Sequence, residues 1–287
     1  MKFSKYHGLG NDYIIIDEYQ EPQIPDPDKA ILARVLCQRK FSIGADGILF
    51  VCPPTRNDAE IRMRIFNVDG SEAEMCGNGI RCFARYVFER GLIQKTEIQV
   101  ETRAGIIIPS LTIVDGAVNS IKVDMGEPQF LRKEIPMKGP NTRVINEDLK
   151  IGDKNLKITC LSVGNPHCVI FVDDIERVDI TQGKIIENHE LFPQRINVEY
   201  VQILNRREIK MRVWERGVGE TLACGTGACA ATVASILNNK TERKIIVHLL
   251  GGDLEINWDQ KNHHIFMTGN AHHVYDGEID ISKIVKR

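Results

Sequence analysis

Short apolar runs dominate this chain, and their length predicts strands more often than helices. In the first half, runs bounded by Gly, Pro, Asp or Asn predict strands at residues 13–17, 48–52, 61–66, 98–101, 106–108 and 121–123. The second half repeats the pattern at residues 169–172, 198–204, 209–214, 245–250 and 254–258. Helical spacing is confined to residues 28–37 and 78–90, while residues 227–237 are apolar nearly all round, which is typical of a buried helix. Many short strands and few helices predict an α+β fold.

Several short segments of the second half of the chain also match segments of the first half. Three pairs of segments correspond: 61–67 with 209–215, 10–11 with 164–165, and 44–46 with 197–199. The pairs keep the same order, with a nearly constant separation along the chain. A repeat of this length indicates two similar domains, since the units of a solenoid are much shorter. We therefore predict two pseudo-symmetric domains from an internal duplication, each a curved mixed sheet around a central helix.

Length, charge and cysteine content limit the class of protein. A chain of 287 residues exceeds what one hydrophobic core usually serves. A net charge of -2 and the lack of a basic stripe argue against nucleic-acid binding. No apolar run approaches the ~20 residues of a membrane span, and the first residues do not resemble a signal peptide. Eight cysteines in such a chain predict reduced thiols and a cytoplasmic location.

Two of the eight cysteines have nearly identical settings. Cys76 and Cys224 each begin a Cys-Gly-x-Gly sequence that opens a predicted helix. Unpaired backbone N–H groups and the positive end of the helix dipole lie there, a setting that binds anions and lowers the pKa of a thiol. Two such thiols facing one ligand would form a symmetric acid/base pair. Such a pair is what inversion of a stereocentre requires.

Other readings of the cysteines carry less weight. The remaining six, Cys82 and Cys229 among them, are predicted to be small buried residues. A metal site is not predicted, because zinc ligands usually come in closely spaced pairs and the chain has no Cys-x-x-Cys. A thiol redox protein stays open as an alternative, but it does not account for the repeated Gly-Asn elements.

Several polar residues occupy matched positions at strand ends. Asn11, Asn67, Asn165 and Asn197 would supply amide donors and acceptors to a cleft between the domains. Glu215-Arg216 follows an apolar strand and precedes the Cys224 loop. A pair of opposite charges at that point suits a zwitterionic ligand, which offers both a carboxylate and an ammonium group. A solvated charge pair is the simpler alternative.

Together these motifs resemble the diaminopimelate epimerase family over essentially the whole chain. The resemblance rests on five segments: residues 7–12 (His-Gly-Leu-Gly-Asn-Asp), 66–72 (Phe-Asn-Val-Asp-Gly-Ser-Glu), 76–82 (Cys-Gly-Asn-Gly-Ile-Arg-Cys), 164–167 (Gly-Asn-Pro-His) and 215–228 (Glu-Arg-Gly through Ala-Cys-Gly-Thr-Gly-Ala). Members of this family work without a cofactor in lysine and cell-wall precursor synthesis. The resemblance implies a small-molecule substrate, diaminopimelate, and a homodimer.

The resemblance also implies roles for individual residues. Cys76 and Cys224 would be the two bases, with His167 close to the thiols. The substrate would be bound by Asn11, Asn67, Gly77, Asn78, Asn165, Asn197, Glu215, Arg216, Gly225 and Thr226. The domains would span residues 1–124 and 125–272, with a last strand within residues 273–287 returning to the first domain. One departure is visible, because a Gln that some members carry is Gly47 here. A proline or hydroxyproline racemase of the same fold is the nearest alternative.

Overall fold

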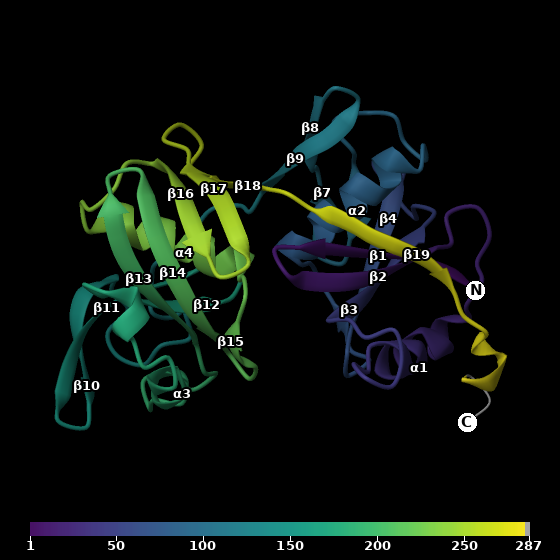
Figure 1. The fold of residues 1–287 in the computed structure, drawn as a ribbon. Coiled ribbons are helices and arrows are strands. Elements are labelled where there is room, and N and C mark those ends of the chain that lie inside the picture. Colours follow the sequence, from purple (N-terminus) through teal and green to yellow (C-terminus); the bar gives the residue numbers. More distant parts are fainter. Residues whose placement is uncertain (285–287) are drawn as a thin grey trace. The chain divides into compact units, whose positions relative to one another are not determined.

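The computed structural model describes residues 1–284 and divides the chain into two compact units. The first unit comprises Met1–Val123 together with the chain from Gly269 onward, and the second comprises Asp124–Thr268. In Figure 1 the first unit runs from purple to blue, and its C-terminal strand returns in yellow. Within residues 1–284, no helix is both long and apolar enough to cross a membrane.

The first unit is built on one mixed sheet with a helix against it. Its strands run in the order β19 (His272–Glu278), β1 (Lys2–Gly8), β2 (Asn11–Asp17), β3 (Gly47–Cys52), β4 (Ile61–Asn67), β6 (Val100–Thr102) and β7 (Gly105–Ile107), with β5 (Glu72–Ala73) beside β4. The pairs β2–β3 and β4–β6 are parallel, and the others are antiparallel. Helix α2 (Gly77–Glu89) lies against these strands. The unit also holds α1 (Asp26–Leu36), the hairpin β8 (Ser110–Val114) and β9 (Ala117–Asp124), and a short 3₁₀ turn, η2 (Ile281–Lys283).

The second unit repeats this topology. Its strands run in the order β10 (Val144–Ile151), β11 (Lys154–Ser162), β12 (Pro166–Phe171), β13 (Asn197–Asn205), β14 (Glu208–Glu215), β16 (Lys244–Leu249), β17 (Gly252–Trp258) and β18 (Ile265–Gly269), with β15 (Gly219–Thr221) beside β14. The pairs β12–β13 and β14–β16 are parallel, like their counterparts in the first unit. Helix α4 (Gly225–Leu237) takes the place of α2, while η1 (Ile175–Arg177) and α3 (Gln182–Glu187) lie between β12 and β13. The predicted α+β fold with two duplicated halves is therefore confirmed.

The two central helices are buried for different reasons. Helix α4 is rich in small apolar residues and is buried from Gly227 to Ser235, as its uniformly apolar sequence predicts. Helix α2 carries a fully buried arginine, Arg81. The Arg81 guanidinium donates to the Gly77 carbonyl at 3.1 Å and to Asn78 Oδ1 at 2.8 Å. Acceptors in the first turn of the helix thus satisfy N–H donors of the buried guanidinium.

Local patterning missed several strands. The strands β1, β5, β8, β10, β11, β15 and β18 were not predicted from the sequence, and β19 was implied only by the family resemblance. Strand β1 has polar residues among its apolar ones, and it pairs with β19 from the other end of the chain. The Asn-Glu-Asp segment of β10 is typical of turns, and Asn146 does have a positive φ of 53° at a break in the register, but pairing with β11 resumes at Glu147. Tertiary pairing therefore overrides local preference in these segments.

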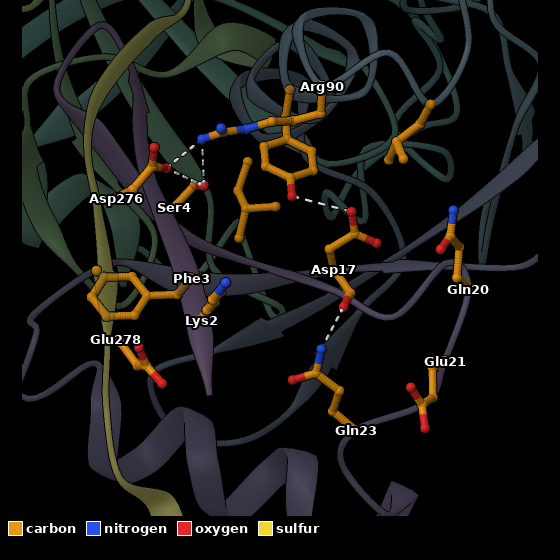
Figure 2. Close-up of a pocket in the computed structure, with 14 residues that line it drawn as sticks. Lys2, Phe3, Ser4, Asp17, Gln20, Glu21, Gln23, Arg90, Asp276 and Glu278 are labelled. Carbon is orange, nitrogen blue, oxygen red and sulfur yellow. Dashed lines mark hydrogen bonds and ion pairs between the residues drawn. The ribbon is translucent and has the colours of Figure 1, made fainter.

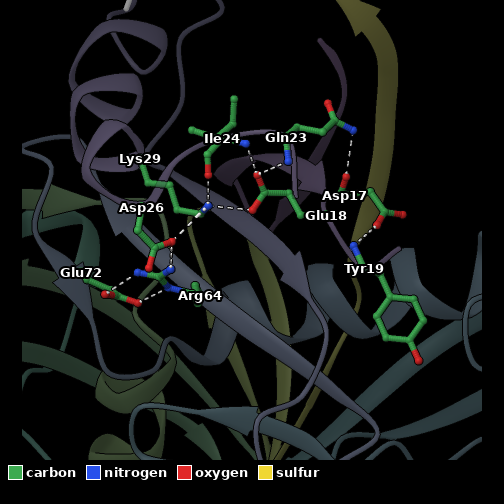
Figure 3. A network of polar contacts seen from close by, with 9 residues as sticks. All are labelled: Asp17, Glu18, Tyr19, Gln23, Ile24, Asp26, Lys29, Arg64 and Glu72. Atoms are coloured by element: carbon green, nitrogen blue, oxygen red, sulfur yellow. Dashed lines mark hydrogen bonds and ion pairs between the residues drawn. The ribbon is translucent and has the colours of Figure 1, made fainter. Parts of the chain in front are cut away.

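The residues shown in Figure 3 form a polar network that joins α1 to the sheet. The ammonium group of Lys29 lies 2.8 Å from Glu18 Oε2, and both side chains are only 3% exposed. Arg64 on β4 binds Asp26 at 2.6 Å and Glu72 on β5 at 2.8 Å. Strand β5 shortly precedes Cys76 in the chain. This network therefore holds in place the segment that ends at Cys76.

We expect Glu18→Ala to lower the free energy of unfolding by about 3–5 kcal/mol, since it removes the buried carboxylate from Lys29 and leaves only the largely exposed Asp26, at 3.3 Å. The Asp26→Asn variant is the matched control. Its carboxylate belongs to the same network but is 70% exposed, so its loss should cost less than about 1 kcal/mol. Urea unfolding followed by circular dichroism measures both values. Equal losses in the two variants would contradict the buried ion pair.

Candidate active site

Cys76 and Cys224 occupy the same position in the two halves, immediately before a central helix. Each is the N-cap residue, with extended backbone angles (φ −142° and −120°). The Cys76 carbonyl accepts the first helical hydrogen bond from Ile80 N, and the Cys224 carbonyl accepts one from Ala228 N. Both cysteines therefore occupy the N-cap of a 13-residue helix, as the sequence predicts, but only the Cys224 side chain accepts a hydrogen bond from an N–H of its helix.

The sulfur of Cys76 is bonded by side chains. The Tyr13 hydroxyl lies 3.0 Å from Cys76 Sγ and also donates to Asn11 Oδ1 at 2.5 Å. Asn11 is held in place from the other side, because its Nδ2 donates to Asp46 at 2.8 Å. Asn78 Nδ2 donates to the same Asn11 oxygen at 3.3 Å. Three predicted residues, Asn11, Cys76 and Asn78, are thus brought together around Tyr13, which the sequence analysis missed.

The sulfur of Cys224 is bonded by its own helix instead. Gly227 N donates to Cys224 Sγ at 3.3 Å, and the Thr226 hydroxyl lies 3.5 Å away. Burial raises the pKa of Cys224 well above its ordinary value, and the nearby carboxylates of Glu215 and Glu199 raise it further. The prediction that the helix N-terminus lowers this pKa is therefore wrong for Cys224. The physical reason is that desolvation by burial, together with the nearby carboxylates, outweighs the opposing bonds from Thr226 and Gly227 N.

A buried histidine–glutamate pair lies in the same half. His167 Nδ1 is 2.7 Å from Glu199 Oε1, and both side chains are fully buried. His167 Nε2 is 2.9 Å from Asn165 Oδ1, so the ring connects Asn165 to Glu199. Glu199 was missed as a site residue, although a carboxylate inside an otherwise apolar strand is a usable signal.

The pH dependence of stability tests this pair. Burial raises the pKa of Glu199, against the opposing effect of His167. A raised pKa in the folded state gives stability that is complete below the unfolded pKa of about 4.3 and is lost as the pH rises through the folded value. We expect the wild type to lose unfolding free energy over this range relative to Glu199→Gln, which stays neutral. Urea titrations from about pH 4 to pH 8 measure the difference, and a constant difference between the proteins would contradict a raised pKa.

The remaining predicted residues surround these two centres. Asn197 Oδ1 accepts from the backbone N–H of Arg216 at 2.9 Å, while Asn197 Nδ2 donates to the Pro166 carbonyl at 2.8 Å. The Arg216 guanidinium donates to the Gln194 carbonyl at 3.1 Å. Glu215 accepts from the Thr221 hydroxyl at 2.5 Å. Asn197 therefore holds the Glu215-Arg216 segment in place at the end of β14.

In the first unit, Asn67 is exposed at the end of β4, where its Nδ2 donates to Ser71 Oγ at 3.0 Å. Gly77 and Gly225 are the first residues of α2 and α4. Neither carries a side chain, so their N–H groups lie beside the cysteines without a Cβ in the way.

The strand register corrects one detail of the repeat. Tyr13 pairs with Gly47 across the parallel strands β2 and β3, and His167 pairs with Asn197 across β12 and β13. Gly47 is therefore the counterpart of Asn197, and the alignment of residues 44–46 with 197–199 is wrong by three residues. Local sequence could not show this, since only hydrogen-bonded pairing defines the register. The corrected register also makes Tyr13 the counterpart of His167.

The pocket shown in Figure 2 lies elsewhere in the first unit, over β1, β2 and β19, with a volume of about 710 Å³. Its polar groups bind one another. Arg90 donates to Ser4 and Asp276, and Tyr86 donates to Asp17 at 3.2 Å. No predicted site residue lines it in the described part of the chain. Among residues 1–284, no three His, Cys, Asp or Glu side chains gather as metal ligands would.

Known proteins share this sequence and fold. The family model described as diaminopimelate epimerase matches residues 3–131 and 159–274. The diaminopimelate epimerase of Moorella thermoacetica is 51% identical over 98% of this chain and all of its own length. That of Pelotomaculum thermopropionicum is 53% identical over 97% of this chain and 98% of its own length.

Among solved structures, a Bacillus anthracis phenazine biosynthesis protein of the PhzF family has a TM-score of 0.71 at 19% identity, covering 98% of this chain and 99% of its own. A probable proline racemase from Agrobacterium radiobacter also has a TM-score of 0.71, at 14% identity, covering 98% of this chain and 93% of its own. At these identities, the two structures show a shared fold alone.

Proposed function

The chain belongs to the diaminopimelate epimerase family, and we propose that it converts L,L-2,6-diaminopimelate to the meso isomer, with Cys76 and Cys224 as the acid/base pair. One observation carries the mechanism. The two thiols are N-cap residues at the same position of duplicated halves, so each has the same relation to a helix N-terminus. An enzyme that must work from either face of one carbon needs two equivalent groups.

The proton transfers follow from this pair. One cysteine, as thiolate, takes the α-proton, and the other, as thiol, gives a proton to the opposite face of the same carbon. In the reverse direction the two exchange roles. Burial and neighbouring carboxylates hold Cys224 as the thiol, which supports Cys224 as the acid and Cys76 as the base for one direction of the reaction.

The negative charge that develops on the α-carbon has to be stabilised without a cofactor that accepts electrons. The family resemblance implies that no pyridoxal phosphate is used. Backbone N–H groups at the starts of α2 and α4, beginning with Gly77-Asn78 and Gly225-Thr226, would bind the reacting carboxylate and spread the charge into it. Such donors are already oriented by the helices, so they need little reorganisation during the reaction.

The test of this function uses purified protein and L,L-diaminopimelate in D₂O without added cofactor. We expect the meso isomer to form with deuterium at the inverted α-carbon, because the incoming proton comes from a solvent-exchanged thiol. Product without deuterium would contradict a two-base mechanism. Deuterium uptake by proline, with none by diaminopimelate, would favour the racemase alternative.

Recognition of the distal end of the substrate gives a further prediction. The proposal assigns this end to Asn67, Asn197 and Arg216, whose planar guanidinium suits a carboxylate. We expect Arg216→Lys to reduce kcat/KM for diaminopimelate at least tenfold, since the ammonium group cannot form two parallel hydrogen bonds. The melting temperature should change little. Arg206→Lys, at an exposed position of the same unit, is the matched control, and equal kinetics for the two variants would show that Arg216 is only a solvated charge.

We also propose a homodimer in the cytoplasm. The family resemblance supports the dimer, and strand β19 offers a suitable edge, with Val274 52% and Tyr275 42% exposed. Analytical ultracentrifugation tests this assembly, and a monomer at assay concentration would rule it out. The eight free cysteines support a reducing compartment.

A further inference from the structure

Cys76 and Cys224 differ in what bonds their sulfur atoms. Cys224 Sγ accepts a hydrogen bond from the backbone N–H of Gly227, three residues into its helix. Cys76 caps α2 without any such side-chain bond to the helix. The group closest to Cys76 Sγ in hydrogen-bonding terms is instead the Tyr13 hydroxyl, at 3.0 Å. A side-chain hydroxyl therefore bonds the sulfur in the first half, whereas a backbone N–H bonds it in the second half.

Tyr13 lies opposite a glycine across the sheet. Tyr13 and Gly47 are paired across β2 and β3. A Cβ at Gly47 would make an ordinary contact with Tyr13 Cε1, at 3.4 Å, but would lie only 2.8 Å from the Phe66 carbonyl oxygen. Position 47, the one departure noted in the sequence, is therefore restricted to glycine by the backbone of β4, and the Tyr13 ring lies beside it.

The Tyr13 hydroxyl can bond Cys76 in either protonation state. Burial raises the pKa of Tyr13 well above its ordinary value, and the Cys76 sulfur raises it further, so the phenol keeps its proton. When Cys76 is a thiol, its S–H can donate to Tyr13 Oη while the Tyr13 O–H donates to Asn11. When Cys76 is a thiolate, the Tyr13 O–H can turn to the sulfur. Asn11 Oδ1 then still accepts from Asn78 Nδ2, so no buried group loses its last partner.

We propose that Tyr13 is a positioning residue whose hydroxyl reverses its hydrogen bond as Cys76 gains and loses a proton. The inference rests on the proposed role of Cys76 as an acid/base group. A two-base epimerase uses each thiol in both forms, and this hydroxyl keeps both forms of Cys76 bonded and aimed in the same direction. His167 holds the corresponding position in the second half and binds Asn165 as Tyr13 binds Asn11, but it is paired with Glu199.

The Tyr13→Phe variant tests this inference through the reactivity of Cys76 in the absence of substrate. Cys76 is the only one of the eight cysteines that is not buried, so a small alkylating agent should modify it first. Without the hydroxyl the thiolate loses a donor, and we expect alkylation of Cys76 at neutral pH to slow about tenfold or more. Iodoacetamide labelling followed by peptide mass spectrometry measures this rate at Cys76 alone.

The kinetic readout is the pH profile of epimerisation. We expect kcat to fall and KM to change little in Tyr13→Phe, with the acidic limb of kcat/KM moving to higher pH, because the thiolate forms less readily. Tyr86→Phe is the matched control: it removes a hydroxyl from another buried tyrosine of the same unit, bonded to Asp17. This control variant should be less stable, but its rate of Cys76 alkylation and the acidic limb of its kcat/KM profile should not change.

Two outcomes would overturn the inference. The first is an unchanged alkylation rate at Cys76 in a folded Tyr13→Phe protein. The second is an equal change in rate in Tyr86→Phe, which would show a general loss of packing. These results are distinct from a failure of the proposed function, because alkylation reports the Tyr13–Cys76 contact whether or not the protein epimerises diaminopimelate.

Discussion

Replacing Cys76 or Cys224 with Ala is expected to abolish epimerisation while the protein stays folded. In the proposed mechanism each thiol acts on one face of the α-carbon, so neither can substitute for the other. Both cysteines also lie at helix N-caps through their backbone, which Ala retains. A stereospecific assay for meso-diaminopimelate measures activity, and circular dichroism verifies folding.

The chain offers matched controls for these variants. Cys82 and Cys229 lie in the same two helices and are fully buried. Their replacement by Ala makes the same chemical change but touches no proposed reacting group, so Cys82→Ala and Cys229→Ala should retain most activity. More than a few per cent of wild-type turnover in Cys76→Ala or Cys224→Ala would end the two-base assignment.

Gly227→Ala is expected to lower kcat about 10²–10³-fold, in the range seen on loss of one preorganised donor. A Cβ at Gly227 would lie 2.9 Å from Glu199 Oε1 and 3.2 Å from Cys224 Sγ. It would therefore push on the sulfur and on the buried carboxyl group together, and would move the N–H that donates to the sulfur. Steady-state kinetics in both reaction directions measure the loss, with stability checked by thermal melting.

The duplicated half provides the control for this glycine. Gly79 holds the same position after Cys76, but a Cβ there would meet Cys76 Cβ, Ile65 and Leu49 only at an ordinary 3.5 Å. Gly79→Ala should keep activity within a few-fold, and Ala favours the helix more than Gly does. Equal loss in both variants would show that a small residue is needed at each helix start for another reason. Near wild-type turnover in Gly227→Ala would show that the hydrogen bond from Gly227 N to Cys224 Sγ is not important for catalysis.

The sequence by itself determined the duplication and the place of the two thiols. Both depend on local signals. Apolar runs of strand length recur in matched order, and Cys-Gly-x-Gly precedes a helical pattern in each half. Helices α2 and α4 each begin at the residue after the cysteine. The backbone of each cysteine is extended, and the residues that follow it are helical. Such features involve neighbouring residues, so one chain is enough to read them.

Tertiary structure decided how each thiol is bonded. Tyr13 lies on a strand 63 residues before Cys76, and only the tertiary structure brings its hydroxyl to the sulfur. Glu199 is visible in the sequence as a carboxylate within a predicted strand, but only the pairing of β12 with β13 brings it to His167. The raised pKa of Cys224 has the same origin: a helix N-terminus is visible in sequence, whereas burial and approaching carboxylates depend on contacts between distant segments. The identity of the proposed reacting groups thus depends on local sequence, whereas their pKa values depend on the fold.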